Sequence, residues 1–238
     1  MPDGLKFAAR FSYITNYLDF CGPRKPNILY DFVTGKQHDK PKVEDHLSRF
    51  EVLLPYLKSI SAKHSMDCFD YKVVEAYWLG NKLLDKFNSD DMFHIISALE
   101  KRGLVHSMAD QLRHHLPAGM LPHHSFNVFY VGVGSVTHSV KATLQNMDKC
   151  RIACAMVREV KSKSLIVKYC PLRAVNKKIT FGSLLKKKVI YDPAFLPSVQ
   201  PNSLVALHWD FAVEILSEKQ KENLEHYTSV VLDSLNQR

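Results

Sequence analysis

The spacing of the hydrophobic residues changes partway along this chain, and that change limits the folds that the chain can adopt. Between residues 43 and 116 apolar side chains recur at the spacing of helices that bury one face. After residue 150 the apolar segments are short and separated by polar turns, as strands are. The sequence therefore predicts an α+β fold, with a mainly helical region over residues 1–148 and a β-rich region with a terminal helix over residues 149–238.

Individual elements follow from the same patterns together with capping and turn residues. We expect helices over residues 43–60, kinked or split by Pro55, from Asp67 or Asp70 to about 86, and over 92–101, 107–116 and 135–147. We expect strands over residues 126–130, 152–160, 165–169, 177–181, 188–191 and 204–209. Ser217, with Gln220 three residues later, predicts a capping box at the start of the terminal helix. The opening 40 residues contain turn residues such as Gly22-Pro23 and predict short pieces that wrap the core.

Length and composition limit the class of protein. A chain of 238 residues with 46% hydrophobic and 24% charged residues is typical of folded proteins and fits two domains, which we place at 1–148 and 149–238. No apolar run approaches the roughly 20 residues that cross a bilayer, and the first ten residues lack the apolar core of a secretory signal, so we expect a cytoplasmic protein. The five cysteines are odd in number and include no Cys-x-x-Cys pair, which predicts reduced thiols and argues against a zinc ribbon or finger.

Positive charge is concentrated in the second half of the chain. Residues 149–192 contain 12 basic and 2 acidic residues, including Lys186, Lys187 and Lys188. Such a surface attracts an acidic protein partner, a nucleic acid or anionic lipid, although an ordinary solvated face has the same composition.

Cys150 and His208 are the candidate metal ligands. Cys150 is expected to open one apolar strand and His208 to close another. A thiolate and a neutral imidazole suit borderline or soft metals, and two such ligands leave positions for ligands from a partner. The alternative is that both side chains serve only packing.

The order of these features resembles the HypC/HupF family of [NiFe]-hydrogenase maturation chaperones. Cys150, His208 and Phe211-Ala212 stand where that family has its Cys, the His that ends a strand, and a Phe-Ala stretch before a helix. Two features differ: Cys150 is internal, and Cys154-Ala155 replaces the family's Pro-Gly. For residues 149–238 the resemblance implies a small OB-like β-barrel. It also implies a non-catalytic chaperone that carries an Fe(CN)2CO fragment and binds a maturation scaffold protein or a hydrogenase large-subunit precursor.

Most of the chain also resembles an uncharacterised prokaryotic family in which a helical region precedes such a module. The resemblance is carried by residues 7–11 (FAARF), 21–23 (CGP), 73–81 (VVEAYWLGN) and 122–126 (PHHSF). It implies an architecture and no activity.

A second group of residues supports an enzyme as the alternative. Cys21 together with His123 or His124 would form a thiolate nucleophile and its base, provided that the folded chain brings them within hydrogen-bond reach. Glu75 lies on a strongly apolar helix, where a buried carboxylate would mark a pocket and one at the solvent edge would not. Structural roles for these four residues remain open, because proximity in sequence supplies no acid–base geometry.

Overall fold

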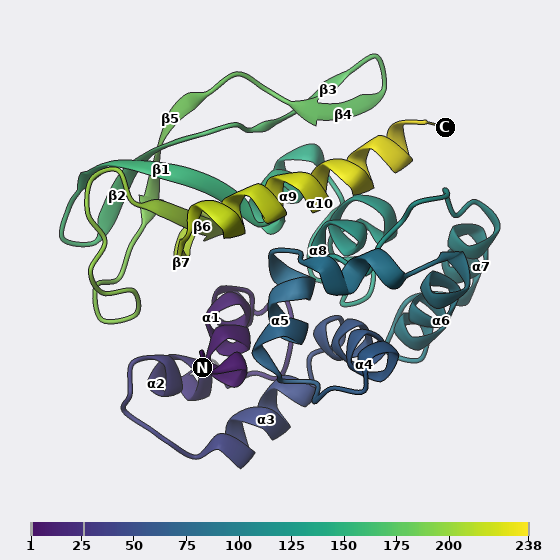
Figure 1. Ribbon diagram of the computed structural model, residues 1–238, viewed down its shortest axis with the longest axis horizontal. Coiled ribbons are helices and arrows are strands. Elements are labelled where there is room, and N and C mark those ends of the chain that lie inside the picture. The colour runs from purple at the N-terminus through teal and green to yellow at the C-terminus, as the bar shows by residue number, and fades with distance from the viewer. Residues whose placement is uncertain (1, 26, 238) are drawn as a thin grey trace.

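The computed structural model describes residues 2–25 and 27–237 and places most of its helices in the first 150 residues (Figure 1). The α-helices are α1 (Gly4–Tyr17), α2 (Asn27–Val33), α3 (Lys40–Ser48), α4 (Leu53–His64), α5 (Tyr71–Trp78), α6 (Ser89–Glu100), α7 (His106–His114), α8 (His124–Phe126), α9 (Leu144–Cys150) and α10 (Glu218–Asn236). A 3-10 helix η1 (Lys82–Lys86) follows α5, and a π-helix η2 (Asn127–Gly132) continues α8. Among the described residues, no helix is both long and apolar enough to cross a membrane.

Five strands close into a ring in the order β1-β2-β5-β7-β6. They are β1 (Ala153–Val160), β2 (Ser164–Tyr169), β5 (Leu185–Ile190), β6 (Leu204–His208) and β7 (Phe211–Leu216). Neighbouring strands are antiparallel, except that β5 meets β7 in parallel at Ile190 and Phe211. The remaining strands, β3 (Leu172–Val175) and β4 (Lys178–Phe181), form a separate hairpin whose two turn residues have positive φ, as tight hairpin turns require. The α+β class is therefore confirmed.

Helix starts follow the predicted capping chemistry. The Asp70 side chain accepts a hydrogen bond from the Lys72 amide at the start of α5. Ser217 and Gln220 form the predicted reciprocal capping box of α10. The segment over 43–60 is split into α3 and α4, with Pro55 in the first turn of α4, where a missing amide hydrogen costs nothing.

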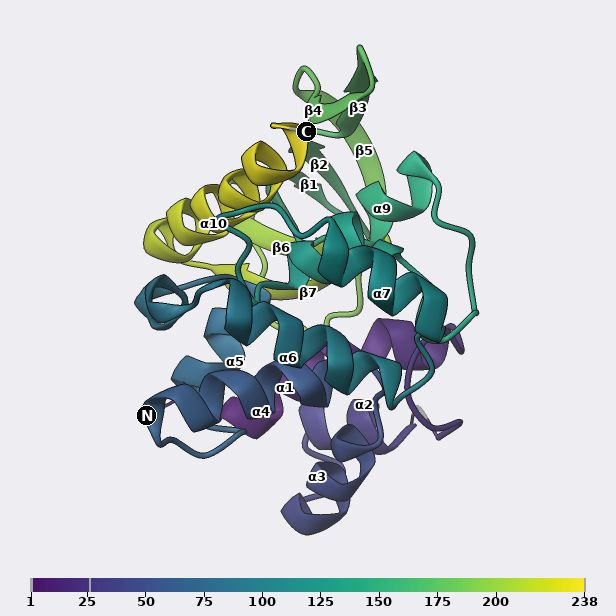
Figure 2. The same cartoon turned by 90° about the vertical axis from the view of Figure 1, so that its right-hand side faces the viewer.

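Helix α1 lies between the other helices and the strand ring. It contacts α2, α5 and β7, and Phe11 at its centre is fully buried against Trp78 of α5, with ring centroids 5.3 Å apart. An ion pair of 2.9 Å between Arg10 and Glu214 joins α1 to β7. Figure 2 shows the strands and α10 above the amino-terminal helices. The buried side chains form one cluster that extends through both halves of the chain, and the proposed domain boundary at 148 stays a prediction.

Several predicted elements are wrong. Residues 126–130 belong to α8 and η2, not to a strand, and every residue from 124 to 133 is buried, so no one-sided pattern marks them as helical. The helix expected over 135–147 begins only at Leu144, because Gly134 and His138 with positive φ hold residues 133–143 in turns. Residues Gly4–Tyr17 form the long helix α1 in place of irregular pieces.

Candidate metal centre

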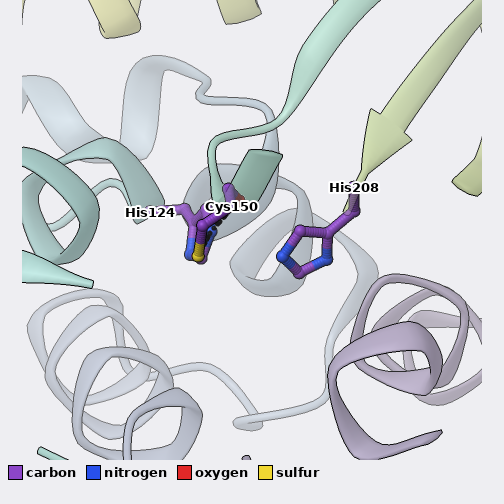
Figure 3. Close-up of side chains that lie close together, drawn as sticks. All are labelled: His124, Cys150 and His208. Carbon is purple, nitrogen blue, oxygen red and sulfur yellow. Dashed lines mark hydrogen bonds between the residues drawn. The ribbon is translucent and has the colours of Figure 1, made fainter. Parts of the chain in front are cut away.

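Three buried side chains from distant parts of the chain meet in the interior of the protein. The ligand atoms of His124, Cys150 and His208 all lie within 4.8 Å of one another (Figure 3). Such a group of two imidazoles and one thiol could hold a metal ion. The structure thus brings the two predicted ligands together and adds His124.

Backbone contacts at the ends of three elements bring these residues together. His124 begins α8, Cys150 ends α9 instead of opening a strand, and His208 ends β6. A two-residue turn, with Trp209 and Asp210 at positive φ, links β6 to β7. The Trp209 amide donates to the carbonyl of the residue before Cys150 at 2.6 Å, which holds the end of α9 against the end of β6.

Hydrogen bonds fix where the imidazole protons lie. His208 Nδ1 is 2.8 Å from the Phe11 carbonyl oxygen, which can only accept, so Nδ1 carries the hydrogen. The buried Nε2 of His208 has no hydrogen-bond partner among the described residues and keeps a free lone pair. This carbonyl contact is typical of the way in which proteins orient a metal-binding histidine.

His124 has partners on both nitrogens. Its Nε2 lies 2.9 Å from the Cys150 carbonyl oxygen and 3.9 Å from Cys150 Sγ, and its Nδ1 lies 3.0 Å from the Tyr77 hydroxyl oxygen. Because the carbonyl oxygen only accepts, the metal-free ring carries its hydrogen on Nε2 and Tyr77 donates to Nδ1. Binding a metal at Nε2 would require the hydrogen to move to Nδ1, where the Tyr77 oxygen can accept it.

Burial sets the charge of the three groups. It lowers the pKa of His124 to about 4 and that of His208 to about 3, so both rings are neutral near pH 7. It raises the pKa of the Cys150 thiol to about 12, against a smaller opposite effect of the Trp209 indole. The metal-free site is therefore uncharged, and its histidines do not need to lose a proton before they bind a cation.

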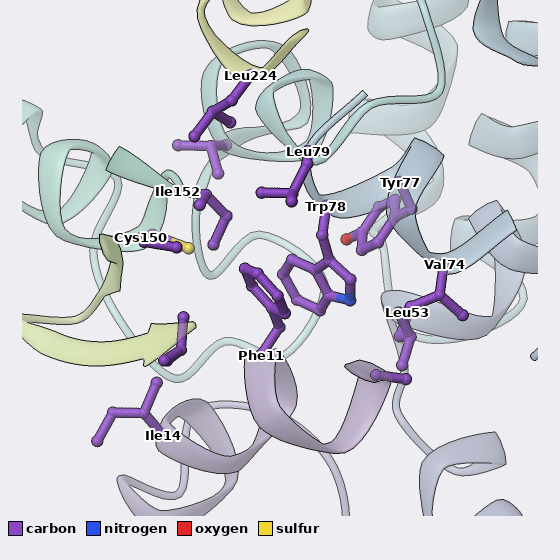
Figure 4. Close-up of a cluster of buried hydrophobic side chains, with 14 of the residues drawn as sticks. Phe11, Ile14, Leu53, Val74, Tyr77, Trp78, Leu79, Cys150, Ile152 and Leu224 are labelled. Atoms are coloured by element: carbon purple, nitrogen blue, oxygen red, sulfur yellow. The ribbon is translucent and has the colours of Figure 1, made fainter. Parts of the chain in front are cut away.

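A cavity of about 50 Å³ lies beside the three side chains. It is lined on other sides by residues that include Ser12, Cys21, Trp78 and Asn127, and Figure 4 shows Trp78 within the surrounding hydrophobic cluster. Ser12 Oγ, Trp78 Nε1 and Asn127 Oδ1 are buried without a hydrogen-bond partner among the described residues. Because buried polar groups are almost always paired, these atoms mark a cavity suited to a polar guest.

Cys21 lines the same cavity as the three ligands. Its thiol donates to Glu51 Oε2 at 3.6 Å, and the Gly22 amide donates to the same oxygen at 2.9 Å. Burial and the Glu51 carboxylate raise the pKa of Cys21, which opposes the thiolate that a nucleophile needs. His124 lies in this cavity but is hydrogen-bonded to Tyr77 and Cys150, not to Cys21.

Glu75 and His123 lie outside the cavity. Glu75 accepts hydrogen bonds from Tyr71, Asn81 and Gln220, so it joins α5 to α10. His123 caps α8 by accepting from the Ser125 amide, and burial lowers its pKa to about 3. The four residues of the enzyme hypothesis therefore do not form one site.

The three consecutive lysines lie on β5 and face different surroundings. Lys186 and Lys188 are exposed, whereas Lys187 pairs with Asp210 and lies over the Tyr169 ring at 5.0 Å. Among the residues that the structure describes, neither Lys186 nor Lys188 has an ion-pair partner, and both are exposed. Their binding to an acidic protein or a nucleic acid stays a prediction.

His124 is the ligand that sequence reasoning did not group with Cys150 and His208. Its segment was expected to lie beside a strand, which hid the helical start that directs the ring toward Cys150. The pair of adjacent histidines was the available signal, and only the fold separates their roles.

The comparisons with known proteins give a family and no activity. Comparison with curated proteins and with solved structures finds no match, and no resemblance of residues 149–238 to the hydrogenase maturation chaperones is shown. One family model matches residues 1–238, in agreement with the expected whole-chain resemblance to an uncharacterised family. The chain therefore belongs to the family of unknown function DUF6390.

Proposed function

We propose that this protein is a non-catalytic accessory protein that holds one metal ion on His124, Cys150 and His208. The observation that carries the proposal is the convergence of these three buried donors, within 4.8 Å of one another, beside a cavity. Two neutral nitrogens and one sulfur suit a borderline metal such as iron or zinc, and three protein ligands leave positions open.

We further propose that the ion is iron and that the protein serves [NiFe]-hydrogenase maturation, as the sequence resemblance of residues 149–238 implies. Support comes from Cys150 and His208, the two residues that carried the resemblance, which lie in one site. The exposed Lys186 and Lys188 would contact an acidic surface of a maturation scaffold protein or of a large-subunit precursor.

Co-production with hydrogenase-maturation scaffold proteins tests both parts. The tagged wild type should be recovered with iron, with a scaffold partner, and with infrared stretching bands of bound cyanide and carbon monoxide. The Cys150→Ala variant should lose the iron and the bands. Cys170→Ala is the matched control, because Cys170 is exposed and does not line the cavity.

The outcomes separate the general proposal from the specific one. If the wild type binds metal and Cys150→Ala does not, but no scaffold partner or infrared bands are found, the proposal of a metal-binding protein stands. The role in hydrogenase maturation is then rejected. Wild-type protein that binds neither iron nor any added divalent ion would reject both.

A further inference from the structure

The cavity places a second thiol near the three candidate ligands. Cys21 follows α1 on the segment that leads to α2 and lines the cavity together with Cys150 and His208. An unpaired nitrogen indicates that the cavity binds a ligand. His208 lines the cavity and is only 1% exposed, and its Nε2 has no hydrogen-bond partner among the described residues. Cys21 is thus the remaining sulfur donor beside an incomplete set of ligands.

Charge balance requires a second anion when a bare divalent ion binds. Two neutral imidazoles and one thiolate leave a net charge of one positive unit in a buried site, and an uncompensated buried charge is costly. No Asp or Glu occurs among the described residues that line the cavity. Cys21 and Cys150 are the cysteines among the described residues that line the cavity, and a thiolate suits a borderline metal better than the hydroxyl groups there.

We propose that Cys21 supplies a second thiolate ligand when a divalent ion enters without anionic ligands of its own, which completes a neutral set of two nitrogens and two sulfurs. This inference rests on the proposed metal site. An iron fragment that carries cyanide brings its own negative charge, so Cys21 would then stay on Glu51. Cys21 would therefore bind a bare divalent ion but not an iron fragment that carries anionic ligands.

The proton of Cys21 has an acceptor in place. As the sulfur–metal bond forms, the thiol proton passes to Glu51 Oε2, its present hydrogen-bond partner at 3.6 Å, and from there to solvent, because Glu51 is partly exposed. Cys150 loses its own proton in the same event, so two protons leave for each ion that binds. The Gly22 amide remains on Glu51 at 2.9 Å and keeps the segment attached while the thiol turns toward the ion.

Cobalt(II) titration of metal-free protein near neutral pH tests this assignment. The sulfur-to-cobalt charge-transfer absorption per bound ion grows with the number of thiolates, so Cys21→Ser should show about half of the wild-type intensity, and Cys150→Ser should also lose about half or fail to bind. Serine keeps the size of the side chain and its hydrogen bond to Glu51. Cys170→Ser should match the wild type.

X-ray absorption of the zinc-loaded wild type provides a test that does not depend on how a variant folds. Two sulfur atoms at about 2.3 Å would support the assignment. One sulfur, together with an unchanged cobalt absorption in Cys21→Ser, would overturn it and leave the three-residue site intact. A second anion from the buffer would show as chloride dependence of the spectrum and would also overturn it. Wild-type protein without any cobalt absorption would instead reject the proposed metal site itself.

Discussion

His208 is held ready for a cation before any ion arrives. The Phe11 carbonyl fixes the hydrogen on Nδ1, and the buried Nε2 keeps its lone pair. Cys150 is in the opposite state, because its buried thiol holds its proton far above neutral pH. Each cysteine that binds the metal ion therefore releases its thiol proton, while the imidazoles release no proton.

This exchange predicts that metal affinity rises with pH. Between about pH 6 and 8 the apparent affinity for zinc should rise about tenfold per pH unit for each thiol that binds, and about a hundredfold if Cys21 binds as well. Competition with a chromogenic chelator at several pH values measures the slope. Cys150→Ser should lower the slope by about a factor of ten in affinity per pH unit, the contribution of one thiol. An affinity that does not depend on pH would contradict ligation by either cysteine.

Buried histidines also predict acid sensitivity of the metal-free protein. Burial lowers the pKa values of His123, His124 and His208 to about 3, 4 and 3, from the usual roughly 6.5 of a histidine, so the unfolded chain takes up protons first as the pH falls. Each histidine should reduce the free energy of unfolding by about 1.4 kcal/mol per pH unit from roughly pH 6 to 4. Denaturant unfolding across this range measures the total slope.

The variant His208→Leu isolates the contribution of one imidazole to the pH dependence of the free energy of unfolding. His208→Leu should lower it by about 1.4 kcal/mol per pH unit, whatever the variant does to stability at neutral pH. His38→Gln, which replaces an exposed histidine, is the matched control for the loss of one imidazole. Equal slopes for His208→Leu and the wild type would mean that His208 becomes protonated in the folded state in this range.

At the scale of elements, local chemistry determined what could be predicted. Asp70, Ser217 and Gln220 act through neighbours in sequence, and they begin helices where the sequence places them. Residues 124–133 are buried on all sides, so alternating apolar and polar positions there carried no information on secondary structure. The pairing of β5 with β7 is a long-range contact that no local pattern encodes.

The same distinction applies to the candidate site. Cys150 and His208 were identified by residue type and order, although α9 and not a strand carries Cys150. His124 and the position of Cys21 in the cavity depend on tertiary packing, and the sequence supplied only their identities.

The capping box of α10 provides a prediction at this scale. Ser217→Ala removes the side chain that accepts from the Gln220 amide at 3.2 Å and should lower the free energy of unfolding by about 1 kcal/mol. Ser229→Ala, within the same helix, should change it by less than about 0.5 kcal/mol. Chemical denaturation compares the two, and equal effects would show that the cap contributes nothing beyond helix propensity.

Across the whole molecule, a bound ion would join segments that lie far apart in sequence. His208 belongs to the strand ring, His124 follows the amino-terminal helices, and Cys150 lies between them. The buried cluster already extends through both halves, and α1 contacts β7. An ion on these ligands would add a further cross-link that exists only in the folded state.

We therefore expect zinc or cobalt(II) to stabilise the protein. At a free metal concentration 100 times the dissociation constant, the gain should be about 2.7 kcal/mol, which raises the melting temperature by about 5 °C or more. Thermal unfolding with and without metal measures the shift, and Cys150→Ser should reduce it strongly. A shift of the same size in that variant would place the stabilising ion elsewhere.

The order of the three ligands along the chain also sets when they become available during synthesis. His208 is translated well after His124 and Cys150, and it reaches the cavity only once β6 has joined the strand ring. A ribosome that stops before β6 releases a chain without the complete site. Bound metal would therefore report that translation had passed β6 and that the chain had folded, so that a partner selecting the loaded form would ignore incomplete chains.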